Sequence, residues 1–439
     1  MEALVFVFGV DFRKVMAHSD PSFLPAGPCG RMGGMTMGSI KAVRGGVTAP
    51  QGYRAAAVEA RIKHPRPDLA MLVSDVPAVA AGMFTTNRIQ AAPVRLCRDR
   101  VRRGRAQAIL VNSGCANACT GTRGWADACR MATMAARALD IREPDMLVCS
   151  TGTIGIPMPM DRVEAAIPKL VAGLNRKGGD AAAKAIMTTD TVDKQEALEF
   201  RVNGKTVRIG GMCKGAGMIE PNMATMLAFL TTDAAVAPGA LKQALRDAVN
   251  RSFNRITVDG DQSTNDTILF LANGMAGNRV LKPGHPAWRL FCEAVQTICL
   301  RLACRLVKDG EGATRFVTVC VKGAASDADA QKATRAIANS LLVKTSWFGA
   351  DPNWGRVIDA VGYSGARVEE SKVDIRYDRL RAVRSGQKDA RTPLSDLEKV
   401  LRQQSFTVEV DLHLGRGTDT VYTCDCSVEY IKINAAYMT

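Results

Sequence analysis

The sequence predicts an α/β fold, with layered sheets flanked by helices, because strand-like and helix-like segments alternate along the chain. Short apolar runs bounded by turn residues, such as Ala70–Val73 and Ala108–Val111, are typical of buried strands. The Ala-rich segment Ala126–Leu139 contains good helix formers and no breaker, which predicts a helix. Phe200–Ile209 carries Asn203–Gly204 between two alternating runs, the pattern of a β-hairpin.

Two further helices are predicted from their boundaries. Asp161–Ile167 is expected to end at Pro168, and Ala240–Asn250 follows Pro238–Gly239.

Alternation of apolar and polar residues predicts strands in the C-terminal half, at Phe316–Val321, Val373–Tyr377 and Phe406–Leu412. We expect the charge-rich stretch Arg376–Arg391 to be an exposed loop or insertion. We expect the aromatic side chains of Trp347, Phe348 and Trp354 to pack in a core or a subunit contact.

Composition excludes several classes of protein. Of the 439 residues, 47% are hydrophobic and 23% charged, which is ordinary for a globular chain and excludes disorder, collagen and coiled coil as the main architecture. No apolar run reaches the roughly 18 residues that a membrane-spanning helix needs. Residues 1–44 show little periodicity and are expected to be a poorly ordered extension or a mis-assigned start.

Neither the cysteines nor the histidines form a metal-binding pattern. The chain has 13 cysteines without a C-x-x-C pair, and its four histidines are widely scattered. We therefore expect free, mostly buried thiols in a reducing compartment, and neither a metal site nor a cofactor. No P-loop motif occurs, and Lys214–Gly217 lacks the third glycine of a dinucleotide-binding fingerprint.

A basic patch leaves two interpretations open. The segment Arg95–Arg105 is rich in arginine, and the net charge is +15 with a pI of about 9.4. The patch is either the solvated face of a helix or part of a nucleic-acid-binding surface. The absence of interleaved aromatic residues for base stacking favours the solvated face.

The segment Cys213–Ala234 suggests chemistry. Thr225 follows a Gly-rich turn and precedes the apolar run Met226–Leu230, so its simplest reading is the first residue of a buried strand. If the chain is cut before Thr225, however, its free α-amine lies beside its own hydroxyl. An α-amine titrates at about 7.7–8.0 and can activate that hydroxyl as a nucleophile near neutral pH.

A second segment, Cys149–Gly155, offers hydroxyls and glycine N–H groups, the composition of an oxyanion hole. Ser/Thr/Gly turns are also common structural features, and both interpretations stay open from this segment alone.

Several blocks together resemble the ornithine acetyltransferase family of arginine biosynthesis, also called glutamate N-acetyltransferase. They run in order from Gly45 to the last residue: Gly45–Pro50, Asn112–Gly121, Ser150–Gly155, Met187–Thr191, Lys214–Leu227, Ser252–Gly274, Lys308–Thr314, Lys344–Gly365 and Glu429–Thr439. The resemblance does not cover the extension.

The resemblance implies a precursor that cleaves itself between Ala224 and Thr225, into an α chain of residues 45–224 and an intertwined β chain of residues 225–439. Thr225 would accept acetyl from N-acetylornithine and pass it to glutamate, by a ping-pong mechanism of the N-terminal-nucleophile type. Thr151 and Gly152 would form the oxyanion hole.

The substrate-binding positions implied by the resemblance are Thr188, Lys214, Thr225, Glu311, Asn434 and Thr439. Lys214, with polar groups of Asn434 and Thr439, would hold a carboxylate, and Glu311 an ammonium. The tail departs from the family at Ala436, where an acid is frequent, and at Met438, where a polar residue is frequent. We assign no chemistry to the matched segment Asp259–Asp266 and expect buried hydrogen bonds there.

The partners implied by the resemblance are the two small-molecule substrates, with acetyl-CoA as a second donor in some members. The α and β chains are expected to associate as a heterotetramer of two α and two β, without nucleic acid or membrane. We expect a cytoplasmic location, with the mitochondrial matrix as the alternative.

Overall fold

The computed structural model describes residues 40–63, 65–220 and 226–436. Ala224, Thr225 and Thr439 therefore lie outside the described residues, as do residues 1–39 of the expected extension.

The larger of the two sheets has nine strands, in the order β1-β6-β7-β8-β9-β3-β4-β5, with β2 paired to β3. The strands are β1 (Lys41–Ala42), β2 (Tyr53–Val58), β3 (Leu69–Phe84), β4 (Arg105–Asn112), β5 (Met146–Ser150), β6 (Lys194–Val202), β7 (Lys205–Lys214), β8 (Leu227–Thr232) and β9 (Thr267–Ala272).

Strand β3 joins two halves of this sheet. Its first part pairs with β2 and β4, its last part pairs with β9, and its pairing with β4 is irregular between Val73 and Ala78. Phe229 of β8 lies in the same apolar cluster as Ile109 of β4 and Leu147 of β5. The sheet therefore folds over at β3, and its two halves pack face to face.

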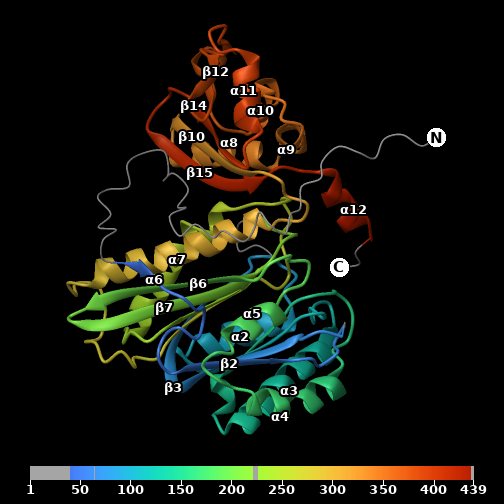
Figure 1. Ribbon diagram of the computed structural model, residues 1–439, viewed down its shortest axis with the longest axis vertical. Helices are drawn as coiled ribbons and strands as arrows, with labels where there is room; N and C mark the ends of the chain where they lie inside the picture. Colours follow the sequence, from blue (N-terminus) through green and yellow to red (C-terminus); the bar gives the residue numbers. More distant parts are fainter. Residues whose placement is uncertain (1–39, 64, 221–225, 437–439) are drawn as a thin grey trace.

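Helices cover the outer faces of both halves. Apolar residues of α6 (Pro238–Asn250) and α7 (Trp288–Lys308) pack with strands β6 to β9, and those of α3 (Gly121–Leu139) and α4 (Met160–Ala172) pack with strands β2 to β5. The shorter α2 (Ala92–Val101) and α5 (Gly179–Ala185) also contact the β2–β5 half. Figure 1 shows the resulting helix–sheet–sheet–helix layers. The predicted layered α/β class is confirmed.

The second sheet has six strands, in the order β13-β12-β11-β14-β10-β15, and lies beyond α7 at the top of Figure 1. Its elements are β10 (Phe316–Ala324), α8 (Asp327–Asn339), α9 (Leu341–Phe348), α10 (Trp354–Tyr363), β11 (Asp374–Tyr377), β12 (Leu380–Arg384), β13 (Gln387–Lys388), α11 (Leu394–Leu401), β14 (Ser405–Asp411) and β15 (Gly417–Cys424). Short 3-10 turns occur at Glu143–Asp145, Phe253–Arg255 and Glu370–Lys372.

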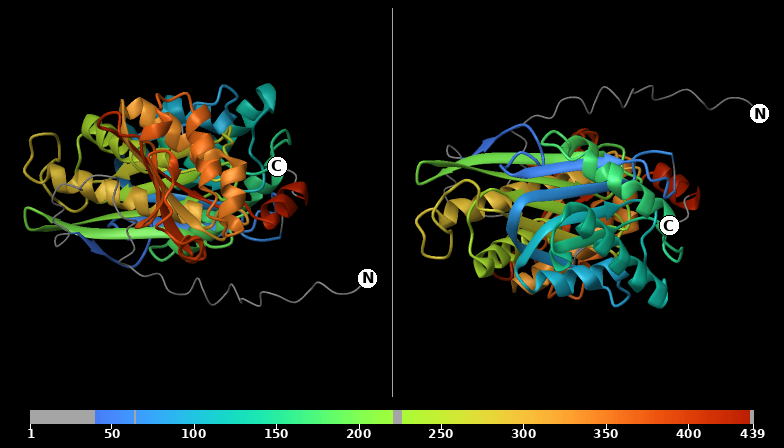
Figure 2. Two further views of the ribbon diagram at one scale, coloured as in Figure 1. Left: turned by 90° about the horizontal axis from the view of Figure 1, so that it is seen from above. Right: turned by 90° about the horizontal axis from the view of Figure 1, so that it is seen from below.

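The last helix, α12 (Val428–Ala436), leaves the second sheet and lies at the side of the molecule in the views of Figures 1 and 2. None of its residues is buried.

Several predicted elements are confirmed. Strands β6 and β7 form the expected hairpin, with Asn203 and Gly204 at the positive φ angles that its two-residue turn requires. The predicted helices in α3 and α6 are present, each beginning earlier than expected, and β10, β11 and β14 match the three expected strands.

The predicted helix stop at Pro168 is wrong, because α4 continues through this proline to Ala172. Proline inside a helix removes one hydrogen bond and costs about 3 kcal/mol. Pro168 is exposed, whereas Val163, Ile167 and Leu170 bury the other face of the helix in the core. Apolar burial on that face offsets the cost of the proline.

One further prediction is corrected. The stretch Arg376–Arg391 is not a loop, because it forms β12, β13 and the end of β11, with Tyr377 and Val383 in the core. Arginines on the exposed positions had obscured this alternation. Trp347 is fully buried and Trp354 packs against the same core, as expected; Phe348 is exposed, so a subunit contact for its side chain stays a prediction.

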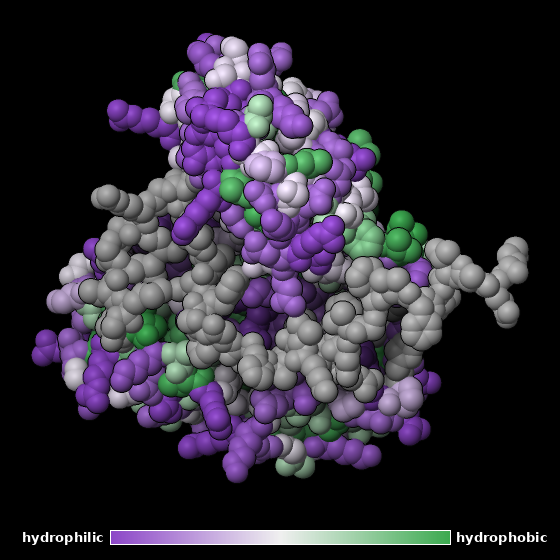
Figure 3. Space-filling view, turned by 45° about the horizontal axis from the view of Figure 1, so that its top comes forward, coloured by the Kyte–Doolittle hydropathy of each residue, from purple (hydrophilic) through white to green (hydrophobic). Residues whose placement is uncertain are grey.

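Ion pairs partly neutralise the basic patch Arg95–Arg105. Most arginines of the basic patch are held in ion pairs: Arg100 with Glu143, Arg102 with Asp99, and both Arg103 and Arg105 with Asp145. On the face shown in Figure 3, hydrophilic residues predominate and apolar ones form small separate groups. Within the described residues, no helix is both long and apolar enough to cross a membrane.

Candidate active site

A cavity of about 250 Å³ opens where the strand ends of both half-sheets meet helix α12. It is lined by Ala116, Thr151, Gly152, Ile154, Thr188, Thr189, Lys214, Gly217, Met218, Asp259, Asp261, Ser263, Thr264, Asn265, Glu311, Tyr430 and Asn434. Every candidate site residue within the described ranges is among them. They come from segments that lie far apart in the sequence.

Thr151 and Gly152 directly follow β5. The Thr151 N–H donates to the Asn112 carbonyl at 3.0 Å, which fixes this turn against β4. Gly152 has a φ of +128°, and a Cβ at this position would lie 2.3 Å from the Gly114 carbonyl carbon. Only glycine fits there. No acceptor for the Gly152 N–H is found within the part of the chain that the structure describes.

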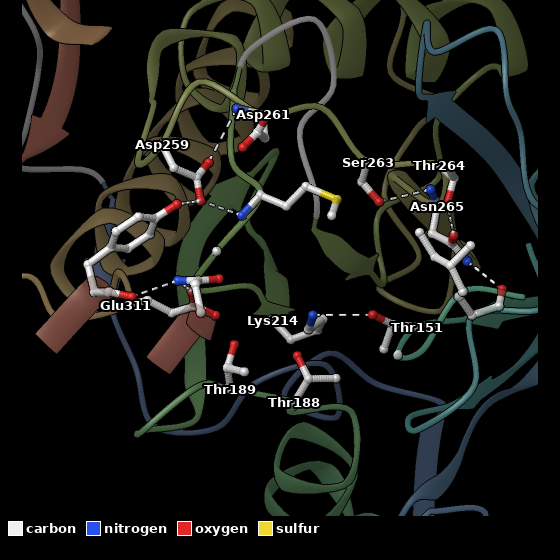
Figure 4. Close-up of a pocket in the computed structure, with 17 residues that line it drawn as sticks. Thr151, Thr188, Thr189, Lys214, Asp259, Asp261, Ser263, Thr264, Asn265 and Glu311 are labelled. Carbon is white, nitrogen blue, oxygen red and sulfur yellow. Dashed lines mark hydrogen bonds between the residues drawn. The ribbon is translucent and has the colours of Figure 1, made fainter. Parts of the chain in front are cut away.

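Lys214 is the last residue of β7 and is buried. Its Nζ donates to the Thr151 hydroxyl at 3.2 Å, as Figure 4 shows. The hydroxyl accepts this bond, so its own proton is available to another acceptor. Burial lowers the pKa of Lys214, and Asp190 is the negative charge that opposes this effect most.

Asn265 supports this side of the cavity. Its Nδ2 donates to the carbonyls of Ala116 at 2.7 Å and Ser150 at 2.8 Å. It therefore ties the loop after β4 to the end of β5. Asn265 lies in the segment for which buried hydrogen bonds were predicted, and such bonds are present.

The opposite side of the cavity is acidic. Glu311 lies beyond the end of α7, and its carboxylate accepts a 2.8 Å hydrogen bond from Asn434 Nδ2 of α12. A Cβ on Gly217 would lie 2.5 Å from the carboxylate carbon of Glu311, so a larger residue at position 217 would displace this carboxylate. We call Thr151, Gly152 and Lys214 the inner end of the cavity, and Glu311, Tyr430 and Asn434 the outer end.

Asp259 anchors the chain between the two ends. It accepts the backbone N–H groups of Met218 at 2.6 Å and Ile219 at 2.8 Å, and the Tyr430 hydroxyl donates to it at 3.4 Å. Burial raises the pKa of Asp259. Sequence reasoning assigned no role to Tyr430, although it lies inside the matched block Glu429–Thr439.

The chain resumes beside Lys214 at Met226. The Met226 N–H donates to Asp266 Oδ1 at 3.0 Å, and Leu227 pairs with Lys214 across β7 and β8. Asp266 is fully buried, and burial raises its pKa well above the ordinary range. The start of β8 therefore adjoins the inner end of the cavity.

The described residues contain no cluster of three His, Cys, Asp or Glu side chains that could hold a metal ion. Eleven cysteines in these ranges carry free thiols, most of them buried.

Comparison with known proteins decides the family. The ArgJ family model matches residues 54–439, which is most of the chain. The chain belongs to the ArgJ family. Among ArgJ relatives, the "Arginine biosynthesis bifunctional protein ArgJ" of Geobacter sulfurreducens is 53% identical over 390 residues, covering 89% of this chain and 99% of that protein. The protein of the same name from Symbiobacterium thermophilum is 51% identical over 398 residues, covering 90% and 99%.

A solved structure also matches part of the chain in sequence. The ornithine acetyltransferase of Mycobacterium tuberculosis complexed with ornithine is 42% identical, covers 42% of this chain and 98% of that chain, and gives a TM-score of 0.39.

Proposed function

We propose that this chain transfers acetyl from N-acetylornithine to glutamate, giving ornithine and N-acetylglutamate. Membership of the ArgJ family makes it an acyltransferase of arginine biosynthesis. The observation that carries the specific reaction is the cavity, which brings together Thr151, Gly152 and Lys214 at one end and Glu311 and Asn434 at the other.

The nucleophile in this proposal is Thr225, freed by cleavage after Ala224. Met226, which follows Thr225 in the sequence, donates its N–H to Asp266 beside the inner end of the cavity. Thr225 Oγ attacks the acetyl carbonyl while its α-amine takes the hydroxyl proton. The amide C–N bond then breaks, and that proton passes to the leaving α-amine of ornithine. The neutral amine of glutamate next attacks the acetyl ester and gives one proton to the α-amine of Thr225. The ester C–O bond then breaks, and that proton passes to Thr225 Oγ as it leaves.

Both tetrahedral intermediates place negative charge on the former carbonyl oxygen. The Thr151 hydroxyl proton and the Gly152 N–H are the donors that we assign to this oxyanion. The hydrogen bond that Thr151 accepts from Lys214 supports the assignment, because it turns the hydroxyl proton away from Lys214. A donor of this kind contributes a factor of about 10²–10³ to the rate.

The charges of the cavity fit an amino-acid substrate. We assign Lys214 and Asn434, with Thr188 and Thr439, to the substrate's carboxylate and polar groups, and Glu311 to its ammonium. Lys214 and Glu311 lie on different sides of the cavity in Figure 4, so a substrate with both charges can span it.

A second donor and an assembly complete the proposal. The proposal includes acetyl-CoA as a further acetyl donor; the relatives are named bifunctional. After cleavage, two α and two β chains are expected to associate, in the cytoplasm or in the mitochondrial matrix.

Mass spectrometry of the purified protein tests the cleavage. We expect two fragments divided between Ala224 and Thr225, and one intact chain in Thr225→Ala. Thr418→Ala, on an exposed position of β15, is the matched control and should still give two fragments. An intact wild-type chain that transfers acetyl would contradict the mechanism.

A further inference from the structure

A buried ion cluster lies behind the cavity wall and contributes no side chain to its lining. Lys194 Nζ, at the start of β6, lies 2.6 Å from Asp190 Oδ1 and 2.5 Å from Asp309 Oδ2. All three residues are buried, and Lys194 is completely so. Asp309 caps the end of α7, so the cluster joins α7 to the first strand of the hairpin.

Each carboxylate of the cluster also holds a segment that lines the cavity. Asp190 accepts the Gly215 N–H at 2.7 Å and the Thr188 N–H at 3.0 Å. Asp309 accepts the Thr191 N–H at 3.1 Å and also the Thr191 hydroxyl. The cluster therefore fixes the backbone beside Lys214 and Thr188. One of its members, Asp309, also lies two positions before Glu311 in the sequence.

The charges of the cluster do not cancel. Two carboxylates and one ammonium leave a net charge of −1 beside Lys214, which is itself buried. The titratable groups that face Lys214 are Asp190, Lys194, Asp266 and Glu311, and burial disfavours the charged form of Asp266. Burial alone would raise the pKa of Asp190, but Lys194 and then Lys214 bring it down to about 2.

A buried ion pair is poor evidence for a role in stability, because well-packed apolar residues of the same volume often serve as well or better. The specific backbone bonds to Gly215 and Thr188, together with the uncancelled charge, favour a role in the site.

We propose that Asp190 and Lys194 are positioning residues for acyl transfer, which hold Thr188 and Lys214 in place and set the charge that faces the Lys214 ammonium. Asp190 supplies a negative charge opposite the Lys214 ammonium. Lys194 keeps the net charge of the cluster at −1. The importance of Lys214 in this inference rests on the proposed function. The electrostatic coupling between the cluster and Lys214 does not depend on that function.

The coupling is tested without turnover by carbamoylation of Lys214 with cyanate, which reacts with the neutral amine. The rate is followed by peptide mass spectrometry as a function of pH. An opposite charge nearby shifts a pKa by about 1–3 units. In Asp190→Asn we therefore expect the midpoint for Lys214 to fall by about one pH unit, and in Lys194→Met to rise.

The double variant Asp190→Asn/Lys194→Met restores a net charge of −1 through Asp309, so its midpoint should return toward that of the wild type. A purely structural role would not produce opposite shifts that cancel. The matched controls are Asp396→Asn and Lys399→Met, which remove an exposed pair on α11 with a 2.8 Å separation, and neither should move the midpoint.

The alkaline limb of the kcat/KM profile for acetyl transfer should move in the same directions, because the site needs Lys214 as an ammonium. Unshifted midpoints in folded Asp190→Asn would overturn the proposal. If Asp190→Asn does not fold, an unshifted Lys214 midpoint in Lys194→Met would overturn the proposal. A wild type without acetyl transfer would instead contradict the proposed function and leave the midpoints as a separate result.

Discussion

The two ends of the cavity are built in different ways. At the inner end, Thr151 and Lys214 are buried, stand at the ends of β5 and β7, and are hydrogen-bonded to each other. At the outer end, Asn434 is exposed on α12, a helix without a buried residue, and it reaches the cavity through its bond to Glu311. Reacting groups need placement to within about 0.5 Å, which a packed sheet provides. We therefore expect changes at the inner end to lower kcat and changes at the outer end to raise KM.

The largest effect is expected for Gly152→Ala. The new Cβ would meet the backbone of Gly114 and Cys115, so it would displace the turn that carries the proposed oxyanion donor. We expect kcat to fall by a factor of at least about 10². Gly155→Ala is the control, because Gly155 also has a positive φ but its Cβ would contact nothing. Similar losses in the two variants would trace the effect to backbone strain instead of to the donor.

Lys214→Met should have the next largest effect. It removes a charge-assisted hydrogen bond worth about 1.5–3 kcal/mol, so kcat/KM should fall by a factor of about 10 to 10². Steady-state assays of acetyl transfer measure this loss, with Lys399→Met on the exposed face of α11 as control. If Lys214→Met changed only KM, Lys214 would belong functionally with the outer end.

The third prediction concerns stability in acid. The pKa of Asp190 is about 2 in the folded chain against an ordinary 3.8, so its contribution of about 2 kcal/mol is present above pH 3.8 and is lost as the pH falls toward 2. Urea unfolding should show a gap between wild type and Asp190→Asn that narrows from pH 7 to pH 3. A gap of constant size would show that the Asp190 charge is not what stabilises the inner end.

The smallest effect is expected for Asn434→Ala. Loss of the hydrogen bond to Glu311 should cost about 1 kcal/mol, which corresponds to a KM increase of about 5-fold with little change in kcat. Lys432→Ala, exposed on the same helix, should leave both constants unchanged. A fall in kcat for Asn434→Ala would remove the distinction between the two ends.

Local signals predicted much of the fold. The Asn203–Gly204 turn identified the hairpin, because few residue pairs adopt its backbone angles. Strand pairing over long distances was not predictable. The sharing of β3 between two half-sheets depends on an irregularity between Val73 and Ala78, where Asp75 and Pro77 lie. These two residues can mark a turn as well as a bulge, so they did not show that one strand continues past them.

Site residues could be predicted from the sequence only where they lie inside a matched block. The matched blocks identified Thr151, Gly152 and Lys214, which the structure brings to one cavity. Lys194 was missed because it lies outside the blocks, and a lone lysine in a polar segment is normally exposed. The role of Lys194 becomes visible only in the folded chain, where the end of α7 places Asp309 next to it.

Strand β8 lies in the middle of the larger sheet, between β7 on one side and β9 on the other. If the backbone is cut just before it, the two pieces would remain interlocked, since neither contains a complete hydrophobic interior. Such an enzyme would purify as a single particle and separate into two bands only after denaturation. Its halves, made apart, would have to meet while folding to give activity.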